Sequence, residues 1–492
     1  MLDFIGIGLG PFNLSLASLL QDKTQLDYLF FEQKDRFDWH AGMQLPNTML
    51  QVPFMADLVS MVDPTSPYSF LNYLKHQQRL YKFYFLEQSH IPRQEYNQYC
   101  QWVAAQLDHI QYQSQVLEIE AMTSGFQVTV EQQGIKQHYR CKQLVIGTGH
   151  VPNLPSCLTD IAKNHAEKCL HSAHYLFKNK ADVTGNVVVL GSGQSAAEVF
   201  LDLFELQNNQ PDQNIELHWF TRSSGFFPME YAPLGLEHFS PDYLQHFYHL
   251  DEKVKHSQLA QQALLYKGIS AKTIREIYQK LYQRSILNPS LNTHLHSCCE
   301  LVEAMLMPNE QIRLHFVHKN TQQTFYLDAD HVIAATGYRT PHFHFMEKIA
   351  AFIQRDQKNH WKITQDYQLE HFANGNIFVQ NLEMHSHGVG TPDLGLGAYR
   401  AAVIANQLAN ERLYELGDQP QTFQHFHLSQ NPNIQFNHPA TTVDESYPSK
   451  TDHRIANLGQ QRRPAPHLPH LQKNRSKLKQ VLSHVFQHEK SL

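Results

Sequence analysis

The first 32 residues alternate between apolar runs and one short glycine-rich stretch. Residues 2–6 are mostly apolar, glycines dominate residues 6–11, and residues 12–20 repeat apolar positions at helical spacing. A second apolar run at residues 28–31 ends at an acidic residue, Glu32. Short apolar runs beside glycines are typical of buried strands, and apolar positions three or four residues apart are typical of a helix. The pattern therefore predicts a strand, a turn, a helix and a second strand.

This order of elements is that of a dinucleotide-binding fingerprint. Gly6 is expected to allow the tight turn, and Gly8 to let backbone N–H groups approach a pyrophosphate at the helix N-terminus. Glu32 follows the glycines by about 20 residues and can accept a hydrogen bond from a ribose hydroxyl. Gly10 and Pro11 complete the turn, and Pro11 stands near the usual place of a third glycine. We therefore predict a nucleotide site at the N-terminus of the chain.

A second strand, glycine turn and helix are predicted within residues 186–206, where a valine-rich run precedes Gly191 and Gly193. The next predicted strand, residues 215–220, is followed by Arg222 instead of an acid. An acid in this place prefers a free ribose 2′-hydroxyl, whereas an arginine can pair with a 2′-phosphate. The second site is therefore predicted to prefer NADPH to NADH.

Two further turns contain a Thr-Gly pair. Residues 147–149 follow a predicted strand at residues 142–146, and Thr336 and Gly337 follow another at residues 330–333. Turns of small residues after apolar strands suit a chain that crosses between two nucleotide domains. Each of these turns is therefore expected to close one domain.

Composition excludes several classes of protein. A net charge of −6 gives no basic field for nucleic acid, and no apolar run approaches the 18 residues of a membrane span. The fold begins at the N-terminus, so no signal peptide is expected. The six cysteines form no C-x-x-C pair, which indicates reduced thiols in the cytoplasm and excludes redox-dithiol flavoenzymes. The 33 histidines follow no metal-ligand spacing such as H-E-x-x-H, so no metal site is expected.

Gly6 and Gly191 are 185 residues apart, and two nucleotide turns in one chain indicate a flavoenzyme with two nucleotide sites. FAD is expected in the first site and NADPH in the second, where it would reduce the flavin. A loop ending at Leu396 precedes a predicted helix at residues 398–408, whose N-terminus can face the flavin edge. Without a C-x-x-C pair, a haem motif or a metal-ligand spacing, dioxygen is the expected oxidant, which predicts a monooxygenase.

A chain of 492 residues is too long for one core and indicates two or three domains. The fold class is predicted to be α/β, with two Rossmann-like dinucleotide-binding domains and a small helical substrate subdomain. From residue 419 the composition shifts to Gln, His, Asn and Pro, which predicts a polar tail with a possible helix at residues 475–487. The expected division is residues 1–170 and 345–418 for FAD, 171–225 and 300–344 for NADPH, 226–299 for the subdomain and 419–492 for the tail.

Several separate motifs together resemble those of the microbial N-hydroxylating flavin monooxygenases. These are the lysine and ornithine N-monooxygenases of hydroxamate siderophore synthesis, and Pro11 is part of their pattern. The resemblance covers roughly residues 1–415 and lapses over the tail. Its motifs are residues 6–14, 39–40, 57–59, 64–70, 191–195 and 335–339.

The resemblance implies that NADPH reduces FAD, that dioxygen forms a C4a-hydroperoxyflavin, and that a neutral primary amine attacks it to give a hydroxylamine. It also implies a homo-oligomer, either a tetramer or a dimer. Gln51 is expected at the flavin face, where it is the candidate catalytic residue. The other cofactor contacts expected from the motifs are Trp39, His40, Gln194, Ser195, Arg222, Thr336, Gly337 and Leu396.

The position of Ala56 bears on the substrate. Amino-acid hydroxylases of the family carry a lysine there, which pairs with the α-carboxylate of the substrate, and an asparagine contact of theirs falls near Tyr266. Removing one partner of a buried ion pair costs about 3–5 kcal/mol. Alanine cannot supply the charge, so a diamine without a carboxylate is predicted: putrescine, cadaverine or diaminopropane.

Other interpretations remain open at this stage. L-lysine N6- or L-ornithine N5-hydroxylation is the alternative within the same class, if another residue supplies the cation, and a different amine such as histamine also fits Ala56. A sulfur- or carbon-oxidising flavin monooxygenase has the same nucleotide architecture, but it is expected to lack the loop at residues 64–70. A nucleotide-binding scaffold without turnover is disfavoured because both glycine turns are intact.

Overall fold

The structure is a computed structural model that describes residues 1–21, 23–288, 291–417 and 419–428. The possible helix at residues 475–487 and most of the predicted tail lie outside these residues. None of the helices in the described ranges is long and apolar enough to cross a membrane.

The first sheet has seven strands in the order β5-β2-β1-β8-β7-β6, with β19 also paired to β8. β8 is long enough to pair with parallel strands and with an antiparallel strand. Its end pairs in parallel with β1 and β19, and its full length pairs antiparallel with β7. The strands are β1 (Leu2–Ile7), β2 (Tyr28–Phe31), β5 (Ile110–Gln111), β6 (Ser114–Ala121), β7 (Phe126–Gln132), β8 (Ile135–Ile146) and β19 (Ile377–Val379).

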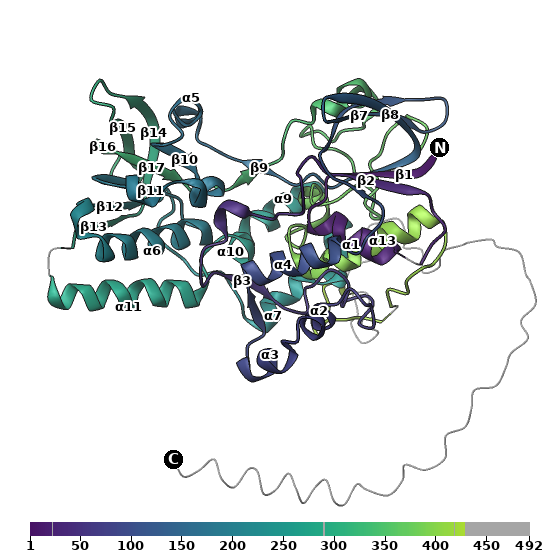
Figure 1. Ribbon diagram of the computed structural model, residues 1–492, viewed down its shortest axis with the longest axis horizontal. Coiled ribbons are helices and arrows are strands. Elements are labelled where there is room, and N and C mark those ends of the chain that lie inside the picture. Colours follow the sequence, from purple (N-terminus) through teal and green to yellow (C-terminus); the bar gives the residue numbers. More distant parts are fainter. Residues whose placement is uncertain (22, 289–290, 418, 429–492) are drawn as a thin grey trace, which may run out of the picture. The chain divides into compact units, whose positions relative to one another are not determined.

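Successive residues of β1 point to opposite faces of this sheet, and each face is covered. Phe4 packs with helices α1, α4 and α13, whereas Ile5 packs with strands β6 and β7 and with η7. Figure 1 shows α1, α4 and α13 together beneath the sheet. The covering elements and their neighbours are α1 (Pro11–Leu20), β3 (Met49–Pro53), α2 (Phe70–His76), α3 (Leu80–Leu86), β4 (His90–Pro92), α4 (Arg93–Ala104), η7 (His344–Phe352) and α13 (Gly397–Ala409).

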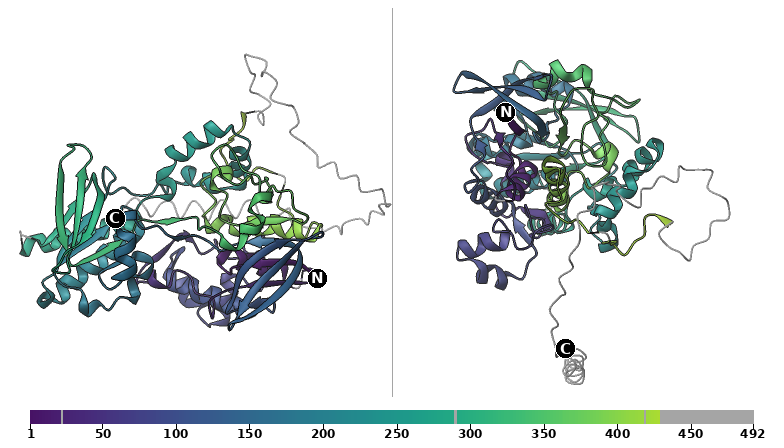
Figure 2. Two further views of the ribbon diagram at one scale, coloured as in Figure 1. Left: turned by 90° about the horizontal axis from the view of Figure 1, so that it is seen from above. Right: turned by 90° about the vertical axis from the view of Figure 1, so that its right-hand side faces the viewer.

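The second sheet has five parallel strands in the order β10-β17-β11-β12-β13. Its faces are covered in the same manner, because Val187 packs with α6 and Val188 packs with the antiparallel sheet β14-β15-β16. Figure 2 shows the two sheets as separate units. The elements are β10 (Cys169–His171), β11 (Asn186–Leu190), α6 (Gln194–Asn209), β12 (Glu216–Phe220), α11 (Ala271–Leu287), β13 (Thr293–His296), β14 (Cys299–Leu306), β15 (Ile312–His318), β16 (Thr324–Ala329) and β17 (His331–Ala334).

The two chain crossings between these halves lie side by side. β9 (Val151–Pro152) and β18 (Tyr338–Arg339) form a short antiparallel pair directly after the two Thr-Gly turns. The turns therefore stand where the sequence placed them, at the ends of β8 and β17. Both α/β halves contain parallel strands and a glycine turn that joins one of them to a helix, so the predicted Rossmann-like fold class is confirmed.

The segment expected as a helical subdomain is divided between two neighbours. Phe247 of α8 packs against Val389, and α8 and α9 both contact α12 (Met384–His387). In contrast, α11 packs on α6 and β13 pairs with β12, so both belong to the second sheet unit. β10 also joins that sheet before the expected boundary at residue 170. The helices concerned are α7 (Pro233–Leu236), α8 (Pro241–Tyr248), α9 (Glu252–Gln261) and α10 (Ala263–Tyr266).

Candidate active-site cleft

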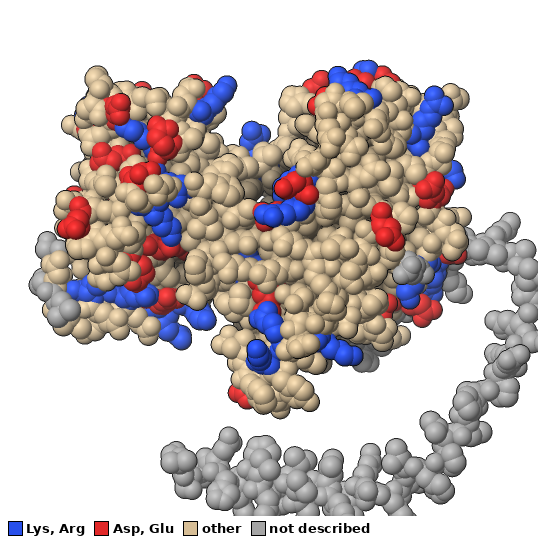
Figure 3. Space-filling view, viewed as in Figure 1, with Lys and Arg blue, Asp and Glu red and all other residues tan. Residues whose placement is uncertain are grey.

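A continuous cleft of about 3020 Å³ lies between the two α/β halves. Its walls include the turns after β1 and β11, α10, and the loops around the crossing strands β9 and β18. Figure 3 shows a hollow between the two halves on one face of the molecule. Pockets for single small ligands hold about 300–1,000 Å³. The cleft is therefore large enough for two dinucleotides and a small substrate.

The turn after β1 forms a cradle for a phosphate group. Gly8 has a φ of +80°, and a β-carbon at this residue would lie 3.0 Å from the carbonyl oxygen of Gly147. The Leu9 N–H donates to Oε2 of Glu32 at 2.7 Å, and the Lys34 N–H donates to Oε1 at 3.0 Å. These two bonds hold the buried Glu32 carboxylate at the edge of the cleft, where a ribose would lie.

The role predicted for Gly6 is wrong. Gly6 lies within β1 and not in the turn, and a β-carbon there would lie 2.1 Å from the ring of Phe30. This glycine is needed for close packing inside the sheet, and Gly8 supplies the positive φ of the turn. Gly10 caps α1 and Pro11 occupies its first turn, where a missing N–H costs nothing.

Gln51 has an unpartnered amide group in the cleft wall. Its Nε2 is buried and lacks a hydrogen-bond partner among the described residues, while its backbone oxygen accepts from the Tyr231 hydroxyl at 3.2 Å. A buried amide without a partner is costly, so a bound ligand that accepts a hydrogen bond would satisfy it. Together with the cradle at Gly8, this free donor fits FAD, whose ring carries several acceptors.

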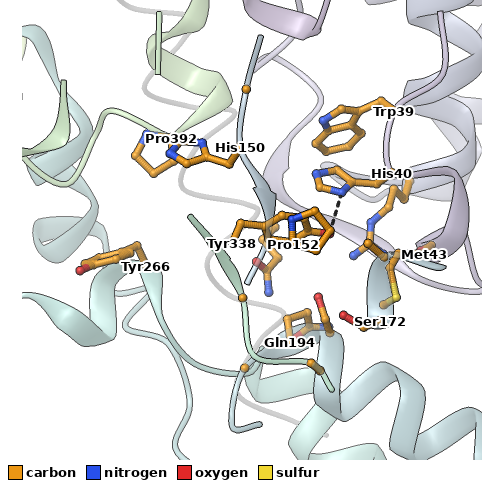
Figure 4. Close-up of a pocket in the computed structure, with 18 of the residues that line it drawn as sticks. Trp39, His40, Met43, His150, Pro152, Ser172, Gln194, Tyr266, Tyr338 and Pro392 are labelled. Atoms are coloured by element: carbon orange, nitrogen blue, oxygen red, sulfur yellow. Dashed lines mark hydrogen bonds between the residues drawn. The ribbon is translucent and has the colours of Figure 1, made fainter. Parts of the chain in front are cut away.

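Trp39 and His40 line the same side of the cleft. The Tyr338 hydroxyl is 3.3 Å from Nδ1 of His40, so β18 contacts the loop before β3 (Figure 4). The ring of His40 is open to the cleft, yet the surrounding protein and the positive charge of Arg93 lower its pKa to about 4. His40 is therefore neutral at physiological pH, and its ring can donate and accept a hydrogen bond.

The second cradle lies at the start of α6. Gly191 has a φ of +139°, and a β-carbon there would lie 2.3 Å from the Ala335 carbonyl oxygen. Gly193 caps α6 and Ser195 stands in its first turn, facing the cleft. The side chain of Arg222 is 77% exposed, and its nearest approach to Glu300 is a long 4.0 Å. This weak contact leaves the guanidinium available to bind a phosphate. These residues fit NADPH.

Gln194 is already engaged by protein groups. Its Nε2 donates to Glu198 at 3.0 Å and to Thr273 at 3.1 Å, and its Oε1 accepts from the Ser270 N–H at 2.8 Å. Figure 4 places Gln194 on the floor of the cleft, near Ser172. Its side chain thus ties the second cradle to the start of α11, and direct contact with NADPH stays a prediction.

A buried ion pair joins the two halves in the wall of the cleft. The guanidinium of Arg93, at the start of α4, donates to both carboxylate oxygens of Glu198 in α6 at 2.9 and 3.0 Å, and to the Met43 carbonyl at 2.5 Å. The side chains are only 12% and 4% exposed. No motif indicated this pair, because its partners are 105 residues apart.

Three other predicted residues lie at the ends of strands or helices. Thr336 donates to the Asn153 carbonyl at 2.6 Å, and Gly337 has a φ of +80°. Both line the cleft at the crossing strands. The side chain of Leu396 is instead buried in the core beneath α1, just before α13. A cofactor contact from Leu396 would therefore come from its backbone.

Ala56 and Tyr266, the predicted substrate residues, both line the cleft. Ala56 is 7% exposed, and Tyr266 ends α10 with the ammonium group of Lys267 5.0 Å from its ring centre. Figure 4 shows Tyr266 across the cleft from Trp39. The two substrate residues thus belong to different walls of one cavity.

The sequence analysis missed an acidic residue beside Ala56. A β-carbon built on Gly395 would lie 2.8 Å from Oδ1 of Asp393 and 3.9 Å from the β-carbon of Ala56, so the two residues flank Gly395. Burial raises the pKa of Asp393 to about 6, although its Oδ1 accepts from the Gly395 N–H at 2.7 Å. Burial and the charge of Asp393 raise the pKa of Tyr231 to about 12, which places this phenol in the same cluster. The available signal in the sequence was an acidic residue, Asp393, in a loop between Gly390 and Gly395.

Known proteins of the same kind cover most of this chain. Rhizobactin siderophore biosynthesis protein RhbE of Rhizobium meliloti (strain 1021) is 40% identical over 436 residues, which are 87% of this chain and 95% of that protein. Putrescine N-hydroxylase of Shewanella oneidensis is 39% identical over 409 residues, which are 82% of this chain and 80% of that protein.

Solved structures agree with the fold. The crystal structure of FAD-bound DfoA, the cadaverine monooxygenase of the desferrioxamine pathway of Erwinia amylovora, has a TM-score of 0.80 and 36% identity, covering 86% of this chain and 98% of that one. The ornithine N-hydroxylase of Kutzneria sp. 744, solved with reduced FAD, NADP⁺ and L-ornithine, has a TM-score of 0.76 and 25% identity, covering 83% and 99%.

The model of the L-lysine 6-monooxygenase/L-ornithine 5-monooxygenase family matches residues 1–340. The two glycine cradles, the unpartnered Gln51 amide and the exposed Arg222 are what an enzyme with one flavin site and one NADPH site requires. The chain therefore belongs to the L-lysine 6-monooxygenase/L-ornithine 5-monooxygenase family of FAD- and NADPH-dependent N-monooxygenases.

Proposed function

We propose that this enzyme hydroxylates one nitrogen of an aliphatic diamine such as putrescine or cadaverine, in hydroxamate siderophore biosynthesis. The observation that carries this proposal is the pairing of Ala56 with Asp393 in the cleft wall. A site with an apolar residue and a carboxylate suits a substrate that carries an ammonium group and no carboxylate. The similarity to a putrescine N-hydroxylase and a cadaverine monooxygenase supports the same class of substrate.

The first half of the molecule would hold FAD and the second half NADPH. Gly8 and the N-terminus of α1 would receive the pyrophosphate of FAD, Glu32 its ribose, and Gln51 the flavin ring. Gly191 would receive the pyrophosphate of NADPH and Arg222 its 2′-phosphate. The chemistry that FAD supplies when bound is the activation of dioxygen and the transfer of one oxygen atom to the amine.

The protein must present one amine as a free base while it binds the other as a cation. An alkylammonium group in water has a pKa of about 10, and an apolar environment lowers that value. Ionised Asp393 would bind the distal ammonium group. The apolar surface near Ala56 would pack against the alkyl chain of the diamine. The carboxylate thus fixes the orientation of the diamine, and the reacting amine loses its proton on desolvation.

The direct test is the amount of hydroxylamine formed by the holoenzyme from putrescine, cadaverine, L-lysine and L-ornithine, measured beside NADPH consumption. We expect product from the diamines and at most uncoupled NADPH oxidation with the amino acids. Product from L-lysine or L-ornithine would overturn the diamine proposal. It would mean that another cation of the cleft wall, such as Lys267, binds the α-carboxylate.

We further propose that the enzyme is a homo-oligomer in which α3 contacts a second copy. None of the seven residues of α3 is buried, and Tyr81, Tyr84 and Phe85 are 77%, 72% and 72% exposed. Three such rings offer about 450 Å² of apolar surface. This is more than half of the roughly 800 Å² that one partner contributes to a standard interface. The surface that carries α3 in Figure 3 is correspondingly mostly uncharged.

We also propose that the enzyme works in the cytoplasm. All six cysteines are free thiols, and five of them are buried. Burial raises the pKa of Cys141 and of Cys169 to about 12, so these thiols stay protonated and unreactive. Free thiols of this kind suit a reducing compartment. Fractionation of the native producer would test this placement.

A further inference from the structure

Two neighbouring strands of the second sheet bring three potential metal ligands together, away from the cleft. His218 of β12 is the direct register partner of His294 of β13, and Glu216 lies two residues before His218 on the same face. Nε2 of His294 is 3.2 Å and Nε2 of His218 is 3.6 Å from Oε1 of Glu216. One ligand atom from each residue lies within 4.8 Å of the other two.

The unpartnered ring of His218 independently indicates a bound ligand at this cluster. The side chain is 9% exposed, and neither ring nitrogen has a hydrogen-bond partner among the described residues. A buried imidazole with two unpaired nitrogens is costly in free energy, and such groups in native proteins call for a partner. A neutral imidazole keeps one nitrogen lone pair, which a metal ion can accept.

We infer that Glu216, His218 and His294 form a binding site for a divalent transition metal ion of the zinc class. Two imidazoles and one carboxylate are ligands that Zn²⁺ accepts, with ligand distances of about 2.0–2.2 Å. Ligand atoms around a tetrahedral ion of that size lie about 3.4 Å apart. The two distances to Oε1 bracket this value. The ligand nitrogens of the two imidazoles lie within 4.8 Å of each other, and the rings stack with centres 4.8 Å apart, so the rings would turn their nitrogens toward one ion.

The position of the site indicates a structural role. β13 is the outermost strand of the second sheet and pairs only with β12 within it (Figure 1). An ion held by both strands would fix this edge strand in register. The NADPH cradle lies beyond the carboxyl end of β11, whereas Glu216 begins β12, so the ion would not take part in the reaction. Glu216 and His294 are 48% and 40% exposed, which gives an ion a path from solvent.

The ionisable groups around the site are compatible with an added positive charge. His296 stacks beside His218 with ring centres 6.0 Å apart, and burial lowers the pKa of His296. Arg222, two residues beyond the end of β12, and Glu300 of β14 lie 4.0 Å apart. The carboxylate of Glu216 is the negative charge that faces both imidazoles.

A second cluster on the surface provides a matched control. His342, His344 and Glu347 also bring three potential ligands together, yet all three are exposed and no buried, unpartnered group accompanies them. We therefore expect this exposed cluster to bind Zn²⁺ far more weakly. His294→Ala and His344→Ala each remove one partly or fully exposed histidine, so neither change is expected to prevent folding.

The experiment titrates Zn²⁺ into the chelator-treated, full-length holoenzyme in competition with a chromophoric chelator. We expect one equivalent whose affinity falls at least tenfold in His294→Ala but not in His344→Ala, since even outer-shell changes at zinc sites have effects of that size. The thermal midpoint should rise with added Zn²⁺ in the wild type and in His344→Ala, and stay constant in His294→Ala. Equal titrations and equal midpoint shifts in the two variants would overturn the proposal.

His218→Phe gives an independent test of the same site. Phenylalanine keeps a ring in the stack and removes both unpaired nitrogens, so this variant should be at least as stable as the wild type without Zn²⁺. It should also lose the tight equivalent. In difference spectra with Co²⁺, absorption bands at longer wavelengths than those of the flavin should appear in the wild type. They should be absent from His218→Phe. A variant that keeps the tight equivalent would contradict a role for His218.

Discussion

At the scale of single residues, the proposed preference for a diamine rests on one small side chain and one acidic side chain. Ala56 supplies no cation for the carboxylate of an amino-acid substrate, and Asp393 supplies a carboxylate for the ammonium group of the proposed diamine. Asp393 is half-buried, and the loss of solvent around its carboxyl raises its pKa to about 6, so a modest fall in pH below neutrality neutralises it. This makes the charge of Asp393 testable by pH.

The first prediction concerns the pH dependence of Asp393. Above about pH 6 the carboxylate is ionised and can bind an ammonium group, and below that pH it is neutral. Deprotonation of the diamine already gives log(kcat/KM) a slope of one below a pH of about 10. We expect the slope to steepen to two below about pH 6 in the wild type and to remain one in Asp393→Asn.

A measurement of stability separates binding from folding at the same position. The raised pKa means that the folded state favours the neutral carboxyl, so its stabilising contribution is present at low pH and is lost as the pH rises through about 6. Asp393→Asn keeps an oxygen for the Gly395 N–H. It should therefore melt no lower than the wild type at pH 7.5, and a lower midpoint would instead indicate a structural role for the carboxylate.

The second prediction concerns Ala56. Ala56→Lys places a cation where the chain of the diamine would lie, so repulsion should raise KM for putrescine at least tenfold, which corresponds to about 1.4 kcal/mol. Ala56→Met adds similar bulk without charge and is the control. If both variants raise KM equally, steric obstruction explains the effect and the charge argument fails.

At the scale of secondary-structure elements, side-chain bonds between distant segments hold the cleft in shape. Asp57 accepts from the N–H groups of Val59 at 2.9 Å and Phe70 at 2.7 Å, and from the Ser60 hydroxyl at 2.6 Å. This one carboxylate orders the loop that follows Ala56. The pair between Arg93 and Glu198 does the same between α4 and α6, and so joins one nucleotide half to the other.

The third prediction tests that pair. Removing one partner of a buried pair leaves an uncompensated charge, which costs about 3–5 kcal/mol. Arg93→Met should therefore lower the melting temperature by several degrees and raise KM for NADPH, because Glu198 also holds Gln194. Adding Glu198→Gln should recover part of the stability.

A pair that is more open to solvent and lies within one half is the control for this prediction. Arg313 and Asp328 are each 28% exposed, compared with 12% and 4% for Arg93 and Glu198, and they lie on neighbouring strands β15 and β16. Exposed pairs contribute about 0–1 kcal/mol, so Arg313→Met should change the melting temperature little and KM for NADPH not at all. Equal effects from the two arginine variants would remove any special role for the pair between the halves.

At the scale of the whole molecule, two α/β halves of similar construction face each other across one cleft. Each half has parallel strands with helices on one face, and the other face is covered by the antiparallel strands β6 and β7 in the first half and by the sheet β14-β15-β16 in the second. The chain crosses between them twice, through β9 and β18. α3 packs against the first core through Phe83 and carries three exposed rings, and residues 87–90, which follow it, line the cleft. Contact with a second copy at α3 would therefore border the site.

The fourth prediction concerns this contact. Tyr84→Lys should shift the enzyme to a smaller species, because a charge in a closely packed apolar interface loses its hydration. Light scattering coupled to size-exclusion chromatography measures the mass directly. Phe372→Glu is the control, since Phe372 is 76% exposed and lies on a different segment. A wild-type enzyme that is already monomeric would refute the proposed interface.

The sequence by itself determined the strands, helices and turns whose formation depends on residues adjacent along the chain. The strands at residues 28–31 and 186–190 have the predicted bounds, and α1 and α13 each begin within one residue of the prediction. Both nucleotide sites, the two Thr-Gly turns and the family were also evident from short motifs. These features are set by local backbone preferences and by the alternation of apolar residues, which a linear pattern records.

Only the tertiary structure decided which distant residues meet. Asp393 lies 337 residues from Ala56, Glu198 lies 105 residues from Arg93, and His294 lies 76 residues from His218. The outer position of β13, which breaks up the expected helical subdomain, follows from the order of strands in the second sheet. Contacts of this kind arise from sheet order and from the packing of helices on sheets, and no spacing along the chain encodes them.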